Sequence, residues 1–391
     1  MTNEEKYKLI IRNLEEVLTE NELKSLIESG TPLKHYIGFE ISGKLHLGYL
    51  FTLLKVKDLQ DVGAETVIWM ADLHSAINDK LDGNIETIKR MANEYFREAM
   101  KALFLCIGGD PEKLIFKLTS ETYAQNPSFW QTMLEAAKTT TVARTKRSIT
   151  IMGREASDDS MPTDKLFYPI MQAADIFLLQ ANIAHAGIDQ RKVHVIARDA
   201  ALQIRTNPLK DAKGNRIKPV AIHHPILLSL SGPVDGGGEA DEVAMKNKMS
   251  KSKPGSGITI HNSPEEIKQK INEAYAPEGQ VEGNPILNWT KYLIFYDRSG
   301  SSSTKVEPQP RSNLNTGVIL TIKRDEKWGG DLSYSNYEEL EKDYADKNLH
   351  PQDLKSAVAE WLIKKLEPAR KYFEDPERKK GLEEIEKLTN H

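Results

Sequence analysis

The sequence predicts an α/β fold: a Rossmann-like, doubly wound parallel sheet with a helical insertion, followed by a mainly α-helical C-terminal part. Three observations carry this expectation. Short apolar runs alternate with segments of helical periodicity between residues 34 and 222. The run TVIWMA at residues 66–71 is apolar throughout, as strands buried on both faces of a parallel sheet are. Beyond residue 337 the spacing is helical, with apolar residues at Leu354, Val358, Leu362 and Leu366.

Each element is expected from its own pattern. Residues 1–30 carry apolar residues at helical spacing and are expected to form helices. Strands are expected at residues 34–40, 66–71, 113–117 and 219–222. Helices are expected at residues 49–59, 85–104, 128–155, 168–179, 191–203 and, near the C-terminus, within 337–387.

The length of 391 residues predicts two or three domains. We expect N-terminal helices at residues 1–33, a Rossmann-like domain at 34–260 and a helical domain at 261–391. The helical insertion of the second domain spans about residues 121–164. Two stretches, 231–247 and 298–316, are rich in turn residues and are expected to be loop insertions, the second of them flexible.

Composition narrows the class of protein. The chain is 39% hydrophobic and 28% charged, and it has no apolar run long enough for a membrane helix, so we expect no membrane contact. Cys106 is the only cysteine, which excludes an internal disulfide and a multi-cysteine zinc site. With no export signal at the N-terminus, a cytoplasmic location is expected. The net charge of −4 means that any nucleic acid must bind local basic patches.

A glycine-containing turn, SGKLHLGY at residues 42–49, lies between an expected strand and an expected helix. Gly43 and Gly48 let the backbone approach a phosphate, and the helix N-terminus adds N–H groups and partial positive charge. His46 can donate a hydrogen bond to a phosphate oxygen. Taken alone, such a turn is more often structural.

A second segment, KMSKSK at residues 248–253, follows the glycine-rich stretch. Lysines spaced by small hydroxyl residues usually form a solvated surface turn. The functional alternative is a mobile loop whose Lys248 and Lys251 ammonium groups reach a polyphosphate, with Ser250 beside them.

In this order, the two segments resemble the paired HIGH and KMSKS signatures of class I aminoacyl-tRNA synthetases. The first is present as HLGY at residues 46–49, with Tyr49 where the signature has a second histidine, and the second matches fully at 248–252. Further blocks resemble the archaeal type of tyrosyl-tRNA synthetase, and together the resemblance covers about residues 9–372. These blocks are HYIGFE (35–40), ADLH (71–74), YPIMQAAD (168–175), GIDQRK (187–192), KWGGD (327–331) and LHPQDLK (349–355).

The resemblance implies a function and two functional domains. The expected reaction is activation of tyrosine by ATP to tyrosyl-adenylate, followed by transfer of tyrosine to the 3′ end of tRNA(Tyr). Residues 34–260 would form the catalytic domain, with a KMSKS loop at 248–252, and residues 261–391 would bind the anticodon.

The resemblance also implies a tyrosine pocket. Tyr36 and Asp175 match the pair that holds the phenol, and Tyr168, Gln172 and Gln190 match the residues that hold the ammonium group. Tyr168, Gln172 and Asp175 are spaced at i, i+4 and i+7, which puts them on one helix face. The same spacing would also describe an ordinary polar helix face.

The expected chemistry is charge stabilisation on ATP rather than covalent catalysis. The resemblance implies His46, Lys248 and Lys251 as catalytic residues. It implies Gly43, His46, Gly48, Lys248, Ser250 and Lys251 as the ATP-binding set. No protein cage for a metal is evident, so Mg²⁺ is expected to arrive with ATP.

The tRNA is the expected macromolecular partner. Arg191 and Lys192 match residues that approach its acceptor end. Trp328 matches an aromatic that stacks on an anticodon base, and His350 and Asp353 match residues that read the edge of that base. Surface charge and ordinary packing are the alternatives.

A homodimer is also implied, through the insertion at about 121–164. Ile149, Ile151 and Met152 could serve that interface or belong to the core of the monomer. The competing functions are a tryptophanyl-tRNA synthetase, a catalytically silent RNA-binding paralogue and a small-molecule adenylate-forming ligase.

Overall fold

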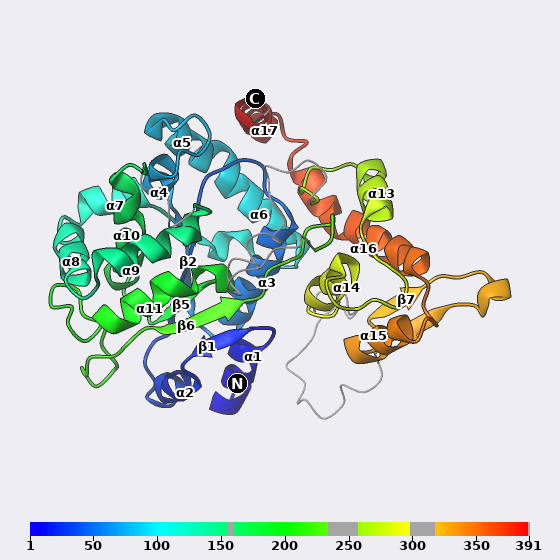
Figure 1. The fold of residues 1–391 in the computed structure, drawn as a ribbon, viewed down its shortest axis with the longest axis horizontal. Helices are drawn as coiled ribbons and strands as arrows, with labels where there is room; N and C mark the ends of the chain where they lie inside the picture. The colour runs from blue at the N-terminus through cyan, green and yellow to red at the C-terminus, as the bar shows by residue number, and fades with distance from the viewer. Residues whose placement is uncertain (155–159, 234–256, 298–316, 390–391) are drawn as a thin grey trace.

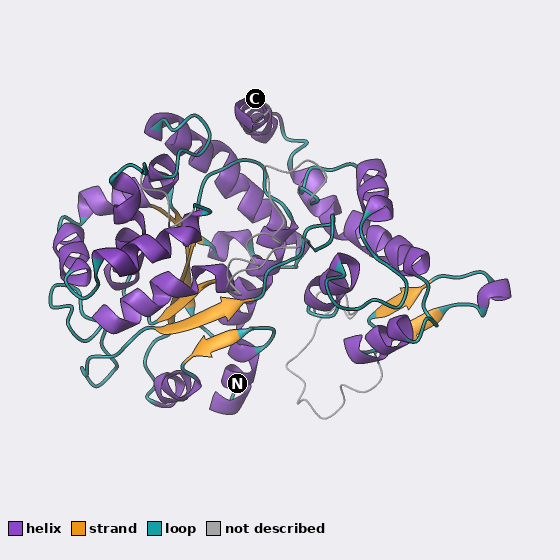
Figure 2. Cartoon of the chain, viewed as in Figure 1, coloured by secondary structure: helices purple, strands orange, loops and turns teal. Residues whose placement is uncertain are grey.

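We describe a computed structural model of the chain, covering residues 1–154, 160–233, 257–297 and 317–389. Its centre is a six-stranded sheet with the order β1-β6-β5-β2-β3-β4 (Figures 1 and 2). All neighbours are parallel except β1, which pairs antiparallel with β6. The bounds are β1 (Glu16–Leu18), β2 (Lys34–Phe39), β3 (Glu65–Met70), β4 (Ile115–Leu118), β5 (Ile183–Gly187) and β6 (Val220–His224). The α/β prediction is confirmed.

Helices cover both faces of this sheet. In β3, Ile68 and Met70 join a core cluster with α3 and α6, whereas Val67 and Trp69 join a second cluster with α8, α10 and α11. This alternation is the period-two geometry of a strand buried on both sides. The α-helices of this part are α1 (Asn3–Ile11), α2 (Glu20–Glu28), α3 (Leu47–Asp61), α4 (Asp72–Ile77), α5 (Ile85–Met91), α6 (Arg97–Cys106), α7 (Thr119–Gln125), α8 (Ser128–Ala137), α9 (Val142–Ser148), α10 (Asp164–Leu178) and α11 (Arg191–Ala200).

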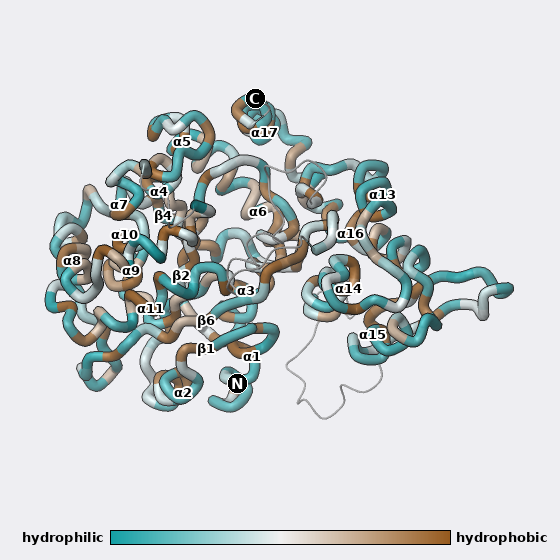
Figure 3. Tube along the Cα trace, in the orientation of Figure 1, coloured by the Kyte–Doolittle hydropathy of each residue, from teal (hydrophilic) through white to brown (hydrophobic). Residues whose placement is uncertain are grey.

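The C-terminal part is mainly helical and packs against the sheet domain through α16, which contacts α6 and α13. Its elements are α13 (Pro264–Glu273), α14 (Pro285–Trp289), β7 (Leu320–Ile322), β8 (Leu332–Tyr334), α15 (Tyr337–Ala345), α16 (Pro351–Tyr372) and α17 (Pro376–Thr389). The largest core cluster runs through both parts, and hydrophobic segments gather in the interior of Figure 3. Among the described residues, no helix has the length and hydrophobicity to span a bilayer.

Several expected elements differ from the structure. Residues 1–30 were expected to be helical, but β1 lies within them and joins the main sheet. A three-residue edge strand leaves no periodicity to detect. Strand β5 was not expected, because its sequence IAHAG lacks the β-branched and aromatic run that marks strands. The hairpin β7–β8 was also missed.

Two expected helices are interrupted. The segment 128–155 is divided into α8, α9 and a 3₁₀ turn, η3 (Ile149–Met152). The segment 85–104 contains a π-helix, η1 (Ala92–Phe96), between α5 and α6. Ile149, Ile151 and Met152 pack with Tyr168 and Val193 in one buried cluster. Their monomer-core alternative is therefore the one that the structure supports.

Candidate active site

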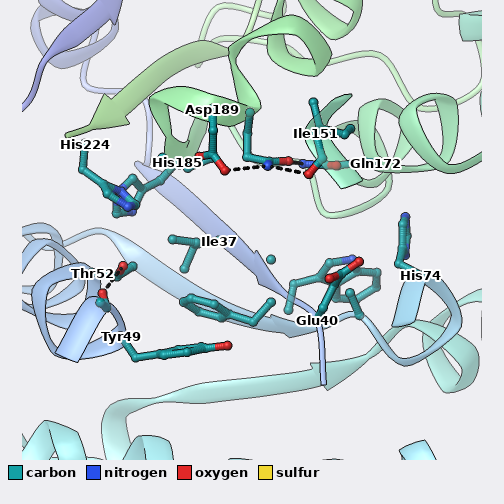
Figure 4. A pocket seen from close by; sticks show the side chains of 18 of the residues that line it. Ile37, Glu40, Tyr49, Thr52, His74, Ile151, Gln172, His185, Asp189 and His224 are labelled. Carbon is teal, nitrogen blue, oxygen red and sulfur yellow. Dashed lines mark hydrogen bonds between the residues drawn. The ribbon is translucent and has the colours of Figure 1, made fainter. Parts of the chain in front are cut away.

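A cavity of about 640 Å³ opens at the carboxyl ends of β2 and β5. From β2 the chain adds β3 and β4 on one side of the sheet, and then β5 and β6 on the other side. The boundary between β2 and β5 is thus a topological switch point, where α/β sheets bind ligands. Figure 4 shows the cavity between His185 and His224 at one end and Glu40 and His74 at the other. Seven of the residues expected from the sequence line it: Tyr36, His46, Gly48, Tyr168, Gln172, Asp175 and Gln190.

Asp175 lies at the buried wall of the cavity and is 1% exposed. Trp69 Nε1 donates to its Oδ2 at 2.9 Å, and the Tyr123 hydroxyl donates to its Oδ1 at 2.5 Å. Burial raises the pKa of Asp175 to about 8, against the lowering effect of the bonds from Tyr123 and Trp69. The carboxyl group is thus a fixed hydrogen-bonding group whose charge is costly.

Tyr36, on β2, lines the cavity as well and packs in the same core cluster as Trp69. Burial first, and then the charge of Asp175, raises the pKa of the Tyr36 hydroxyl well above its usual value. The hydroxyl therefore keeps its proton at neutral pH and can act as a hydrogen-bond donor.

The other residues expected to bind the amino acid lie on α10 and in the 3₁₀ turn η4 (Ile188–Gln190) that follows β5. The Tyr168 hydroxyl donates to Glu40 Oε1 at 3.0 Å, and Gln172 Nε2 donates to Gln190 Oε1 at 3.3 Å. Gln190 Nε2 in turn donates to the Ile151 carbonyl at 3.1 Å and to Asp189 at 3.2 Å (Figure 4). Gln172 Oε1 is buried without a hydrogen-bond partner. It is an acceptor that a bound ammonium group could satisfy.

His74 is a cavity residue to which the sequence assigned no role, although it stands in the ADLH block. It is 2% exposed, and neither ring nitrogen has a hydrogen-bond partner. Its Nε2 lies 3.6 Å from Asp175 Oδ2, and its ring meets the Tyr168 ring edge-on at 4.8 Å. Burial lowers the pKa of His74 to about 3, so the ring is neutral. Such buried polar atoms cost free energy until a ligand or water pairs them.

Three further residues around the pocket were given no role from the sequence, although Glu40 stands in the HYIGFE block. Trp69 and Tyr123 hold Asp175, and they come from β3 and from the first helix of the expected insertion. Glu40 holds Tyr168, accepts from Asn78 Nδ2 at 2.7 Å, and pairs with Lys80 at 3.3 Å. Only the tertiary structure brings these groups to the pocket.

A row of three histidines, of which His35 and His185 are buried, reaches the opposite end of the cavity. His35 Nε2 lies 3.1 Å from His185 Nδ1, and His185 Nε2 lies 2.8 Å from His224 Nδ1. Burial lowers the pKa of His35 to about 3 and that of His185 well below its usual value. The His35 and His185 rings are therefore neutral, and with His224 they form a polar wall across β2, β5 and β6.

His46 caps the N-terminus of α3. Its Nδ1 accepts the Gly48 N–H at 3.1 Å, which leaves the ring proton of the neutral form on Nε2. A Cβ at Gly48 would lie only 2.8 Å from His46 Cε1, so glycine is required for this close approach. Gly43 has a φ of +125°, a conformation that favours glycine, although it does not line the cavity.

Tyr49 replaces the second histidine of the first signature. Its ring packs against Phe39, Phe96 and His46 with centroid distances of 5.3, 5.8 and 5.0 Å. It lines the cavity and is only partly buried. At this position the chain supplies an aromatic wall beside His46 instead of an imidazole.

Lys248, Ser250 and Lys251 lie outside the described residues. The chain that follows them is held against the first signature, because Leu47 N donates to the Ile258 carbonyl and Ile260 N donates to the Leu45 carbonyl, both at 3.1 Å. His46 and Thr259 form an antiparallel bridge between these segments. Segments that are more than 200 residues apart in sequence are thus adjacent.

The expected RNA-binding residues lie outside the cavity. Arg191, at the start of α11, pairs with Glu16 at 2.9 Å, and Lys192 Nζ lies 3.4 Å from Thr150 Oγ1. Trp328 is 68% exposed on the turn before β8. His350 caps α16, and Asp353 lies in its first turn.

Arg324 ties the turn that carries Trp328 to the start of α16. Its guanidinium donates to the Trp328 carbonyl at 2.5 Å and to the Asn348 carbonyl at 3.0 Å. The three expected anticodon residues therefore share one end of the C-terminal part. Across the whole described part of the chain, no group of three or more His, Cys, Asp or Glu side chains is arranged to hold a metal ion.

Comparison with known proteins identifies the class first. A family described as class I tRNA synthetases (W and Y) matches residues 28–367, in agreement with the switch-point cavity. Curated tyrosine–tRNA ligases of Thermococcus sibiricus and Thermococcus kodakarensis are each 47% identical, over 96% and 100% of both chains. The chain belongs to the archaeal type of the tyrosine–tRNA ligase family.

Solved structures agree with this assignment. The tyrosyl-tRNA synthetase of Pyrococcus horikoshii complexed with L-tyrosine is 44% identical, has a TM-score of 0.88, and is covered in full by the whole of this chain. The tyrosyl-tRNA synthetase of Aeropyrum pernix is 37% identical with a TM-score of 0.78, over 98% of this chain and 99% of that one.

Proposed function

We propose that the protein joins tyrosine to tRNA(Tyr), activating the amino acid with ATP to tyrosyl-adenylate and then transferring it to the 3′ end of the RNA. The observation that carries this proposal is the convergence of Tyr36, Asp175 and the Tyr168–Gln172 face of α10 on one cavity that also contains His46. Full-length similarity to tyrosine–tRNA ligases favours tyrosine over tryptophan as the substrate.

The amino acid would lie between α10 and β2. Asp175 accepts the phenol proton, and the Tyr36 hydroxyl donates to the phenol oxygen. Tyr168, Gln172 and Gln190 surround the ammonium group, and the unpaired Gln172 Oε1 supplies an acceptor. Phenylalanine is rejected because it offers no hydroxyl group to the buried hydroxyl of Tyr36 and the buried carboxyl group of Asp175.

ATP would lie toward His46. The carboxylate of tyrosine attacks the α-phosphorus, a new P–O bond forms, and the bond to the bridging oxygen breaks to release pyrophosphate. A ribose hydroxyl of the RNA then attacks the carbonyl carbon and AMP leaves. Gly43, Gly48 and the helix N-terminus accommodate phosphate, and His46 donates from Nε2.

Lys248, Ser250 and Lys251 would complete the phosphate site, and Mg²⁺ would accompany ATP. Because these lysines act on charge that develops in the transition state, Lys251→Ala should slow adenylate formation while leaving tyrosine affinity within about twofold. Single-turnover activation and equilibrium tyrosine binding measure the two effects. An unchanged activation rate would make Lys251 an ordinary surface lysine.

The RNA would contact two separate regions. Arg191 and Lys192, at the start of α11, would lie near the acceptor end of the RNA. The ion pair between Arg191 and Glu16 would open or rearrange when the RNA binds. At the far end, exposed Trp328 stacks on an anticodon base while His350 and Asp353 read its edge.

A homodimer in the cytoplasm completes the proposal. Trp130 and Leu134, one turn apart on α8, are 50% and 62% exposed, and Val142 on α9 is exposed as well. This apolar surface lies within the insertion that was expected to form the interface. Sedimentation velocity at micromolar concentration should give a dimer, and a monomer would remove this part of the proposal.

Amino-acid-dependent exchange of pyrophosphate into ATP tests the function directly. Tyrosine should support exchange, while tryptophan and phenylalanine should not do so at equal concentration. Exchange with tryptophan would indicate the sister enzyme. No exchange with any amino acid, alongside retained binding of tRNA(Tyr), would indicate a silent RNA-binding paralogue.

A further inference from the structure

Tyr95 lies in the π-helix η1, behind the first signature. A π-turn inserts one extra residue into a helix and is frequent at functional sites. Tyr95 is fully buried, and its hydroxyl accepts the Leu45 backbone N–H at 3.1 Å. Leu45 directly precedes His46, so this bond fixes the backbone from which the catalytic imidazole projects.

The same hydroxyl lies 2.9 Å from His261 Nε2. His261 follows the segment that carries the second signature. Burial lowers the pKa of His261 to about 3, so its ring is neutral and Nε2 can accept the Tyr95 proton. One hydroxyl group thus accepts from the residue before the first signature and donates to the segment after the second.

The end of α16 closes this contact. The Phe373 ring meets the His261 ring at 4.7 Å, nearly perpendicular, and lies 5.9 Å from the Tyr95 ring. Next to it, the Tyr372 hydroxyl donates to Glu98 Oε2 at 2.6 Å on α6. The 22 residues of α16 span about 33 Å at the usual helical rise, and Asp353 lies at the other end.

Helix α17 contacts both the π-helix η1 and the segment before His46. Gly381 approaches the Glu94 carbonyl of the π-helix so closely that a Cβ would lie 2.5 Å from its oxygen. Lys44, two residues before His46, pairs with Glu386 at 2.9 Å. Figure 1 shows α17 next to α5, apart from the rest of the C-terminal part. The end of α16 and helix α17 therefore both contact the region around Tyr95 and Leu45.

We propose that Tyr95 is a positioning residue for tyrosine activation, whose hydroxyl sets the His46 segment and links it, through His261 and Phe373, to the C-terminal helix α16. The proposal rests on the activity proposed above. Tyr95 does not line the cavity and acts only through Leu45 and His261.

Tyr95→Phe removes the hydroxyl and little else. We expect the rate of pyrophosphate exchange to fall about 3- to 10-fold, the range for one lost hydrogen bond, with tyrosine binding within about twofold. In hydrogen exchange, peptides containing Leu45 should lose protection while peptides from β5 keep theirs. Tyr7→Phe is the matched control, because the Tyr7 hydroxyl donates to Glu20 at 2.5 Å, far from the signatures. This variant should leave the rate of pyrophosphate exchange unchanged.

His261→Phe supplies the second arm. If Tyr95 and His261 act as one unit, the double variant should be no slower than the slower single variant, instead of showing the product of the two effects. A wild-type exchange rate in Tyr95→Phe, or a parallel loss of tyrosine binding and exchange, would overturn the proposal. Failure of the wild-type protein to exchange with tyrosine would instead overturn the proposed activity, and the Leu45 protection would still report on the contact.

Discussion

Among single residues, Asp175 combines the strongest constraint with the clearest chemistry. Two donors, Trp69 and Tyr123, hold its carboxyl group, and burial raises its pKa to about 8. A carboxyl group kept in an apolar wall at this cost is expected where a ligand needs it. The phenol of tyrosine is the proposed ligand.

Asp175→Asn should slow tyrosine activation and reduce discrimination against phenylalanine, because the amide accepts the phenol proton less strongly and can itself donate. Leaving a buried polar group without its partner costs about 1–3 kcal/mol, or roughly 5- to 150-fold in rate. Rates of exchange with tyrosine and with phenylalanine measure it. A ratio of the two rates equal to that of the wild type would contradict the phenol assignment.

The same residue predicts a pH dependence of stability. The unfolded chain releases the Asp175 proton near pH 4, whereas the folded protein holds it to about pH 8. The contribution of Asp175 to stability is therefore fully present below about pH 4 and is lost as the pH rises toward 8. The Asp175→Asn variant does not lose stability in this way, because an amide does not titrate in this pH range. Its Tm relative to wild type should rise between about pH 4.5 and pH 8.5, and a constant difference would contradict the buried, proton-holding state.

At the scale of elements, the start of α3 shows how a helix terminus creates a site. His46 caps the helix with Nδ1 and so presents an Nε2 proton, and this geometry requires that residue 48 have no Cβ. The π-helix η1 behind it supplies Tyr95. Neither feature follows from the apolar pattern that places the helices themselves.

Gly48→Ala should separate activity from stability. Alanine favours the helix by up to ~1 kcal/mol over glycine, which offsets the loss of the His46 cap, so thermal stability should change little. The new Cβ would displace the His46 ring, and exchange should fall at least about tenfold. Gly317→Ala, where a Cβ meets nothing within 4 Å, serves as the control. Normal exchange in Gly48→Ala would show that the His46 geometry is dispensable.

Across the whole molecule, α16 joins two proposed sites. Its first turn carries Asp353 and its last residues pack at Tyr95, with α6 and α13 along its sides. The two parts share one core cluster, so the C-terminal part is held firmly against the sheet domain. Because the two proposed sites lie at opposite ends of α16, a change at one site should leave the function of the other intact.

Asp353→Ala should leave tyrosine-dependent exchange intact and reduce aminoacylation of tRNA(Tyr). One lost contact to a base edge costs about 1–3 kcal/mol, and the loss should disappear on an RNA altered at the first anticodon base. Asp346→Ala, an exposed change in the turn before α16, should affect neither step. Equal losses on both RNAs together with impaired exchange would leave Asp353 a structural role.

The sequence by itself determined the fold class, the family and seven of the residues that line the cavity. Apolar patterns specify buried strands and helices, because side chains that recur at the period of a strand or a helix lie on one face of that element. Spacing placed Tyr168, Gln172 and Asp175 on one helix face, and the resemblance to tyrosyl-tRNA synthetases singled out Tyr36, His46 and Gln190 as well.

Only the tertiary structure decided the rest. Strands β1 and β5 depend on neighbours in the sheet, since their own residues have weak strand preferences. Trp69 and Tyr123 reach Asp175, and Tyr95 reaches Leu45 and His261, across separations of 50 to 166 residues. Hydrogen bonds between such distant residues leave no periodicity in a single sequence, because they are set by how the elements pack.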